Sequence, residues 1–169
     1  MEFRDILHTK AKSGEKFRFE DLTLHTTFDV IGKATFGQSL NAKREGSLAL
    51  EHWENMSRAF ASIRGSWNLI KNFFKKRLVR TEAKKLDAIL AGIIRQRFDL
   101  VVRENTNLSS KKGLNIMDLI LRESMDEIRQ LNKQELDPIF LADAITQIKT
   151  LLVAGTGTTS NTICFTMML

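Results

Sequence analysis

Proline occurs once among the 169 residues, as Pro138, and glycine occurs only nine times. β-Sandwiches and β-barrels need these residues for their many turns, so this shortage argues against both folds. Hydrophobic residues make up 43% of the chain and charged residues 27%, which is typical of one globular domain and excludes a disordered or collagen-like chain. The sequence therefore predicts an all-α fold.

Apolar residues recur at helical spacing in several segments. In chain order, we expect the end of a helix at residues 1–12 closed by Ser13 and Gly14, a helix capped by Asp21 and ended by Gly37, a helix at residues 49–63, a basic helix capped by Thr81 and ending near Glu104, a surface loop at residues 105–113, and a short helix around residues 116–121.

The last segment is predicted to be one long helix that begins at Pro138, because the first helical position tolerates proline. Its apolar stripe leads into a glycine- and threonine-rich stretch, residues 151–160. Each glycine costs a helix about 1 kcal/mol, so this turn is expected to be weak. Thr158 can bond back to the carbonyl of Ala154 and bend the helix axis, which would open a groove beside small residues.

Two other interpretations of this stretch fit less well. Gly155, Gly157 and Ser160 approach a dinucleotide-binding fingerprint with residues 150–154 as its strand, but the third glycine is missing and the preceding period is helical. Residues 150–169 are numerous enough to form a membrane-spanning helix, and none of them is charged. However, ten of the twenty residues from 150 to 169 are Thr, Gly, Ser or Asn, so we expect no transmembrane segment.

The net charge of +6 is concentrated in one segment. Between Lys71 and Arg103 stand ten basic and three acidic residues, and this segment follows the aromatic residues Trp67, Phe73 and Phe74. Aromatic residues followed by cations are typical of a helix on an anionic membrane surface, and a solvated helix face explains the pattern equally well. No zinc-finger spacing or aromatic strand motif accompanies the charge, so nucleic acid is not an expected partner.

Residues 151–162 resemble the oxygen-binding signature of the central helix in the cytochrome P-450 family, the haem-thiolate monooxygenases. The family pattern is Ala-Gly, one free position, an acidic residue, Thr, then Thr or Ser; Ala154, Gly155, Thr158 and Thr159 match it. Upstream segments resemble the family's helices E, F, G and H in order, namely residues 28–37, 48–63, the basic stretch, and 116–121.

The resemblance implies a mainly helical fold that ends in the long, kinked central helix, called helix I. It also implies a haem cofactor, dioxygen, a lipophilic small-molecule substrate, and electrons from NADPH through a reductase. By resemblance, Thr158 is the catalytic residue that helps deliver protons to dioxygen. The expected cofactor-binding residues are Ala154, Gly155, Thr158 and Thr159. In the family, small residues at the positions of Ala154 and Gly155 let the helix approach the porphyrin.

The sequence departs from the family pattern at Gly157, which occupies the acidic position. Glycine has no carboxylate to relay protons and no side chain to hold water. The departure leaves three outcomes open: slowed or uncoupled turnover, a rearrangement that does not need this proton delivery, or a non-functional gene copy.

The family's haem-ligating cysteine loop and its Glu-x-x-Arg motif are not found in these residues. Cys164 lies in the helical pattern six residues after Thr158, which favours a small buried hydrophobe and not an iron ligand. A single cysteine makes no internal disulfide, and His8, His25 and His52 are too far apart in sequence to indicate a metal site. We therefore expect residues 1–169 to be a single partial domain that is inactive alone.

The resemblance is nearest to the eukaryotic branch of the family, which implies a full-length protein on the cytoplasmic face of the endoplasmic reticulum membrane. No signal peptide is expected at the charged start of these residues. Four aromatic residues, Trp53, Phe60, Trp67 and Phe73, are candidates either for the substrate cavity or for the core. The alternative function is a non-catalytic helical module in which residues 67–77 bind membranes or a partner helix.

Overall fold

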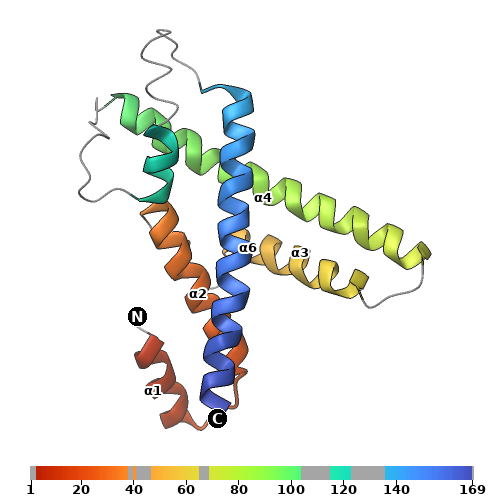
Figure 1. Cartoon of the computed structure of the whole chain (residues 1–169). Coiled ribbons are helices and arrows are strands. Elements are labelled where there is room, and N and C mark those ends of the chain that lie inside the picture. Colours follow the sequence, from red (N-terminus) through yellow and green to blue (C-terminus); the bar gives the residue numbers. More distant parts are fainter. Residues whose placement is uncertain are drawn as a thin grey trace.

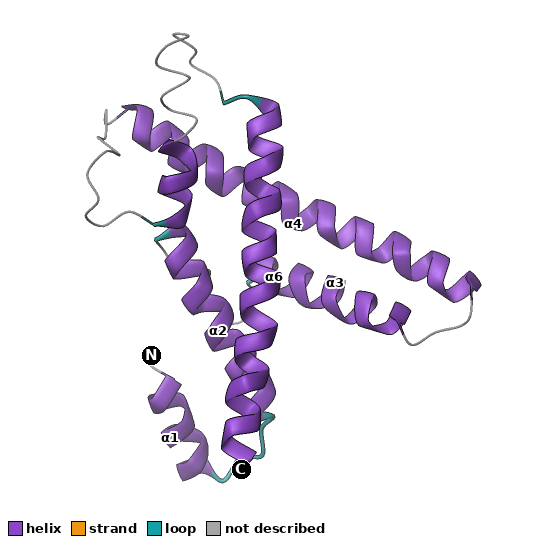
Figure 2. Ribbon diagram, viewed as in Figure 1, coloured by secondary structure: helices purple, strands orange, loops and turns teal. Residues whose placement is uncertain are grey.

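The computed structural model describes residues 3–37, 40, 47–64, 69–103, 115–122 and 136–168. Within these residues every regular element is a helix, as Figure 2 shows, so the predicted all-α fold is confirmed. The helices are α1 (Phe3–Ser13), α2 (Phe19–Phe36), α3 (Leu48–Arg64), α4 (Leu69–Arg103), a short helix at residues 116–122, and α6 (Pro138–Met168).

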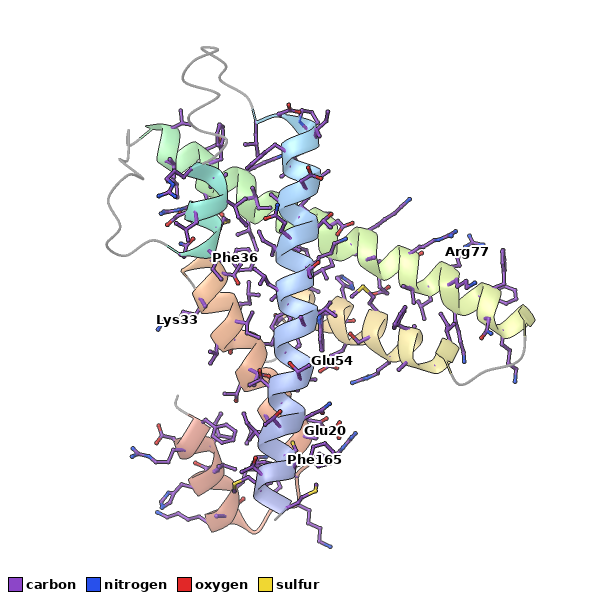
Figure 3. The ribbon with its side chains drawn as sticks, viewed as in Figure 1. Glu20, Lys33, Phe36, Glu54, Arg77 and Phe165 are labelled. Carbon is purple, nitrogen blue, oxygen red and sulfur yellow. The ribbon has the colours of Figure 1, made fainter. Side chains whose placement is uncertain are left out.

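Helix α6 is the central element of the molecule (Figure 1). Helix α2 packs along its carboxyl-terminal half, and α4 crosses it nearer its start. Figure 3 shows Glu20, near the start of α2, close to Phe165, near the end of α6. Helices α3 and α4 pack along each other and extend together away from α6. Residues far apart in sequence are therefore brought to the same faces of α6.

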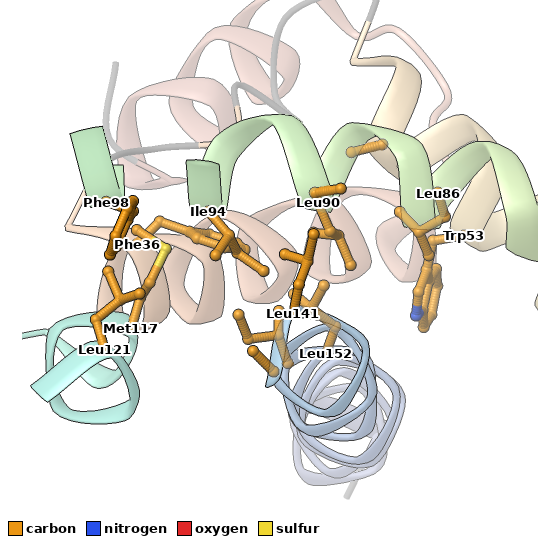
Figure 4. Close-up of a cluster of buried hydrophobic side chains, with 14 of the residues drawn as sticks. Phe36, Trp53, Leu86, Leu90, Ile94, Phe98, Met117, Leu121, Leu141 and Leu152 are labelled. Atoms are coloured by element: carbon orange, nitrogen blue, oxygen red, sulfur yellow. The ribbon is translucent and has the colours of Figure 1, made fainter. Parts of the chain in front are cut away.

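One hydrophobic core joins these helices (Figure 4). Leu86, Leu90 and Ile94 of α4 are fully buried, and so are Ile148 and Leu152 of α6. Burial of side chains of this size contributes about 1.5–3 kcal/mol each. The core fixes α6 against α2 and α4, and thereby fixes which face of α6 stays open.

Two predicted helix starts are wrong. Asp21 does not cap α2: the helix begins at Phe19, its N-cap residue is Arg18, and no side chain caps it. Thr81 does not cap the basic helix either, because α4 begins at Leu69 and the Thr81 hydroxyl donates to the carbonyl of Arg77 at 3.0 Å. Both residues have the chemistry of a cap, but each lies inside its helix, which begins upstream of it.

The predicted helix ends hold better. Helix α2 ends at Gly37, whose φ of 73° is left-handed and whose N–H donates to Lys33, as expected of a glycine cap. Gly14, after α1, also has a positive φ. The expected loop at residues 105–113 lies outside the described residues.

Helix α6 is long and apolar enough to cross a membrane, and within its most apolar window 28% is buried. We expected no transmembrane segment, and this expectation is corrected: by length and composition alone, α6 qualifies as a candidate span. Core helices of globular proteins meet the same two criteria, and α6 packs against α2 and α4.

Candidate functional site

The start of α6 is fixed by Asp137 and Pro138, as the sequence predicts. The Ile139 N–H donates to the Asp137 carboxylate at 2.8 Å, which satisfies one of the unpaired amides at the helix start. Six residues at three- or four-residue spacing form the buried face of α6: Leu141, Ala144, Ile148, Leu152, Thr156 and Ser160. The other residues of the glycine- and threonine-rich stretch, 151–160, therefore lie on the remaining sides of α6.

Helix α6 continues without a break through residues 151–160. The strand that a dinucleotide-binding site would need at residues 150–154 is helix, so that alternative is wrong. The Thr158 hydroxyl donates to the carbonyl oxygen of Ala154 at 2.5 Å, which confirms the predicted back-bond. Thr146, Thr150, Thr162 and Thr166 make the same four-residue bond, so α6 carries a row of threonines whose hydroxyls are held against its own backbone.

Ala154, Thr158 and Thr159 are exposed on α6. Ala154 is three residues before Gly157 and four before Thr158, so it lies between them on the helix surface. Beyond its Cβ, Ala154 presents no side chain, and a Cβ built at Gly157 would meet no atom within 4 Å. This part of α6 is thus an open strip of small residues beside one hydroxyl.

Gly155 lies on a different side of the helix. A Cβ built there would come within 2.6 Å of the Ile31 Cδ1 of α2. A side chain at position 155 would therefore require the terminal methyl of Ile31 to shift. The role of Gly155 beside a cofactor, like the roles of Ala154, Thr158 and Thr159, stays a prediction.

A cavity of about 630 Å³ adjoins the open strip. Its lining comes from α3, α4 and α6, and consists of Trp53, Met56, Ser57, Phe60, Ala61, Val79, Val153 and Gly157. None of these residues is charged, and the volume is that of an ordinary small-molecule pocket. Gly157 belongs both to the cavity wall and to the strip that carries Thr158.

A polar cluster next to Trp53 joins α3 to α4. His52, next to Trp53, has its Nδ1 2.7 Å from a Glu82 oxygen, and Lys85 donates to the other oxygen of Glu82 at 3.0 Å. The Glu82 side chain is 7% exposed. The hydrogen bond from Lys85, and next the one from His52, lower the pKa of Glu82 from its ordinary 4.5, against the effect of burial. Sequence reasoning missed this contact, since 30 residues separate His52 from Glu82.

The chain matches the family model described as Cytochrome P450 over residues 2–169. It belongs to the cytochrome P450 family. A curated relative, "Cytochrome P450 52A5" of Candida maltosa, is 24% identical over 160 residues, which are 94% of this chain and 29% of that protein. The chain thus spans less than a third of the length of this cytochrome P450. No solved structure matches the chain.

Family membership implies a haem, and the open strip of α6 fits one. A flat cofactor needs a helix face without bulky side chains, and Ala154 with the vacant side of Gly157 supplies it. Among the described residues, no group of three His, Cys, Asp or Glu is placed to bind a metal ion directly.

Cys164 is half-buried on α6, and its sulfur lies 3.2 Å from the Thr23 hydroxyl, which is itself 2.9 Å from the Ser160 hydroxyl. The expected small hydrophobe is thus part of a polar contact between α2 and α6.

The four aromatic candidates separate in the structure. Trp53 and Phe60 line the cavity, whereas Phe73 is 67% exposed and is absent from its lining. Trp67 lies outside the described residues. Met56 and Val79 line the cavity as well and were not predicted. The helical spacing of Trp53, Met56 and Phe60 was the available signal, but spacing alone did not separate core from cavity.

Proposed function

We propose that this chain is part of a haem-dependent cytochrome P450 monooxygenase that oxidises a lipophilic small molecule. One observation carries the proposal: Gly157 lines the uncharged cavity and is also next to Thr158 on the open strip of α6. Substrate space and the face for oxygen chemistry thus meet at one turn of one helix. The family match supports the same activity.

Ala154 and Thr158 would face the haem, which when bound supplies the iron that activates dioxygen. Thr159, which is also exposed, is a further residue proposed for the cofactor site. Gly155 lies against Ile31 of α2, so the contact between α2 and α6 is close at this turn. In the overall reaction one oxygen atom enters the substrate and the other leaves as water, with two electrons from NADPH through a reductase and two protons from solvent.

Thr158 is the proposed catalytic residue. Its hydroxyl donates to the carbonyl of Ala154, and its oxygen keeps lone pairs that accept a hydrogen bond from water, so the hydroxyl can take up a proton as it gives up its own. Rotation about χ1 releases the O–H from the carbonyl, so the same group can pass a proton onward. Relay through a positioned hydroxyl is ordinary general acid–base chemistry.

We also propose that residues 1–169 are one partial domain and are inactive alone. In support of this, these residues hold a single cysteine, Cys164 of α6, and its sulfur contacts the Thr23 hydroxyl of α2.

The experiment is product analysis under ¹⁸O₂ with the complete gene product, loaded with haem and supplied with NADPH and a reductase. A neutral aromatic probe such as 2-ethylnaphthalene should gain one ¹⁸O atom per product molecule. Product oxygen that comes only from water, or absence of product while the protein holds haem, would contradict the proposal.

A second function is favoured by the outer end of α4. Phe73 and Phe74 are 67% and 63% exposed, and Lys76 and Arg77 beside them are also exposed. Figure 3 shows Arg77 on the part of α4 that extends away from α6. We propose that this end contacts an anionic membrane, consistent with a full-length protein on the cytoplasmic face of the endoplasmic reticulum membrane.

Binding to vesicles of phosphatidylcholine with one-quarter phosphatidylserine tests this contact. Replacing Phe73 and Phe74 with serine should weaken binding, and added salt should weaken it further. Phe165, which is 69% exposed on α6, gives the matched control Phe165→Ser. Equal losses in both variants would show that residues 73 and 74 have no special part in the contact.

A further inference from the structure

The α6 side of the cavity steps back at Gly157. Val153, one helical turn earlier, lines the same cavity and is 46% exposed. Gly157 follows it on this side of α6 without a side chain, and a Cβ built there would meet no atom within 4 Å. The vacant place beside Gly157, which we name the Gly157 recess, therefore belongs to the cavity.

Neither the backbone nor the neighbours of Gly157 account for the glycine. Its φ is not positive, and glycine is a poor residue for the interior of a helix. At Gly155 a Cβ would come within 2.6 Å of the Ile31 Cδ1, whereas no described residue packs against the corresponding place at Gly157. The recess is thus open room in the wall of the cavity, and the occupant of the cavity is what can use it.

The remaining lining indicates the chemistry of that occupant. No lining residue is charged, and Trp53 and Phe60 give the α3 side two aromatic side chains. Aromatic and aliphatic walls bind apolar surface, and a charged group would lose its hydration here without a counter-charge in the lining. The cavity therefore suits an uncharged molecule with a large apolar surface.

We propose that Gly157 is a specificity-determining residue whose recess receives part of the substrate. The inference rests on the proposed monooxygenase function and specifies its substrate class: an uncharged lipophile, such as a fused-ring hydrocarbon, that is broad enough to extend from the α3 side into the recess. A substrate in the recess lies against the turn of α6 that carries Thr158. Gly157 itself contacts the substrate and takes no part in proton transfer.

Equilibrium dialysis of the complete gene product tests the proposal with two flat hydrocarbons, pyrene with four fused rings and 2-ethylnaphthalene with two. Gly157→Val fills the recess. It should weaken binding of pyrene by about tenfold, because added carbon overpacks a filled site, and leave the smaller probe within about twofold. Gly157→Ala should have an intermediate effect on pyrene. Asn161→Val adds valine at an exposed position one turn later, outside the lining, and should change neither affinity.

A second measurement tests the contact itself. In a Cys164→Ser background, the thiol of Gly157→Cys should react with N-ethylmaleimide severalfold more slowly when pyrene is bound, because the probe covers it. The thiol of Asn161→Cys is the matched control, and its reaction rate should not depend on pyrene.

Equal effects of Gly157→Val on the two probes would overturn the proposal, and so would failure of the wild type to bind pyrene. Should Gly157→Val not fold, the thiol measurement decides, and alkylation of Gly157→Cys that pyrene does not slow would overturn the proposal as well. Neither measurement needs turnover, so failure of the ¹⁸O₂ experiment and failure of this selectivity are separate results.

Discussion

Gly157 is the residue at which this chain departs from the family pattern, and its surroundings leave room for the expected acid. A Cβ built at Gly157 meets no atom within 4 Å, and Thr158 follows directly on α6. An aspartate at this position therefore fits without displacing a neighbour, and its carboxylate would stand one residue from the proposed proton relay.

Gly157→Asp should restore proton delivery in the complete gene product. We expect the ratio of oxidised product to leaked peroxide to rise by about tenfold, because a positioned acid or base contributes roughly 10²–10⁴-fold in favourable geometry. The measurement is product and peroxide formed per NADPH consumed. Gly157→Asn, which has the same shape without an ionisable group, is the control. An unchanged ratio in the Asp variant would show that this chain does not use the family's acidic position.

Glu82 determines how the wall between α3 and α4 responds to pH. Its pKa is lowered by Lys85 and His52, so its folded pKa lies below the ordinary 4.5. A group with a depressed folded pKa stabilises the protein above its unfolded pKa, and this stabilisation is lost as the pH falls through the folded value. Glu82 should therefore contribute fully to the stability of the folded protein near neutral pH, and this contribution should be lost in acid below its folded pKa.

Glu82→Gln should lower the urea midpoint near neutral pH and bring the variant closer to the wild type as the pH is reduced from about 6 to about 3. Urea unfolding at several pH values measures this. Glu20→Gln, which removes a surface partner of Arg18 that is 60% exposed, is the control and should change little. A constant difference between wild type and Glu82→Gln at every pH would contradict the assigned coupling.

At the scale of elements, the two glycines of the α6 turn have different reasons to lack a side chain. Gly155 faces Ile31 at a distance that no Cβ tolerates, whereas Gly157 faces open space. Alanine is about 1 kcal/mol more favourable than glycine inside a helix. The two positions thus allow helix propensity to be separated from helix packing.

Gly157→Ala should stabilise the protein by up to about 1 kcal/mol, while Gly155→Ala should gain less or lose stability because Ile31 must move. Ile31→Val deletes the Cδ1 that causes the collision, so Gly155→Ala should become stabilising in that background. Urea denaturation of the four combinations at positions 31 and 155 gives the coupling. Additive effects would show that α2 does not approach α6 as described.

Helix limits were predictable from sequence where a local signal decided them. Pro138 after Asp137 and the left-handed Gly37 fix helix ends by their own backbone chemistry, and the structure has both. Asp21 and Thr81 carry similar signals but lie inside helices that begin at Phe19 and Leu69. Local capping chemistry is a weak term compared with burial of a whole helix face.

At the scale of the whole molecule, the sequence predicted the elements and their order but not the cavity. Thr158 could be found by resemblance, and its back-bond to Ala154 followed from spacing alone. The cavity joins residues of α3, α4 and α6 that are up to about a hundred positions apart. Such contacts depend on how the helices cross, which helical periodicity does not determine.

The same arrangement explains why the open strip of α6 is available to a cofactor. Helix α2 covers one side through Thr23, Thr27 and Ile31, and the α3–α4 pair forms the cavity on another. Ala154 and Thr158 stay exposed between these contacts. We propose that Thr158 moves a proton on this exposed side.

The most direct test of that claim is the peroxide formed per NADPH consumed by Thr158→Ala in the complete gene product. Thr158→Ser keeps the hydroxyl, and Thr162→Ala removes the next exposed, back-bonded threonine one turn away. We expect that Thr158→Ala alone diverts electrons to peroxide and lowers product formation by about tenfold or more. Equal peroxide yields in Thr158→Ala, Thr162→Ala and the wild type would contradict it.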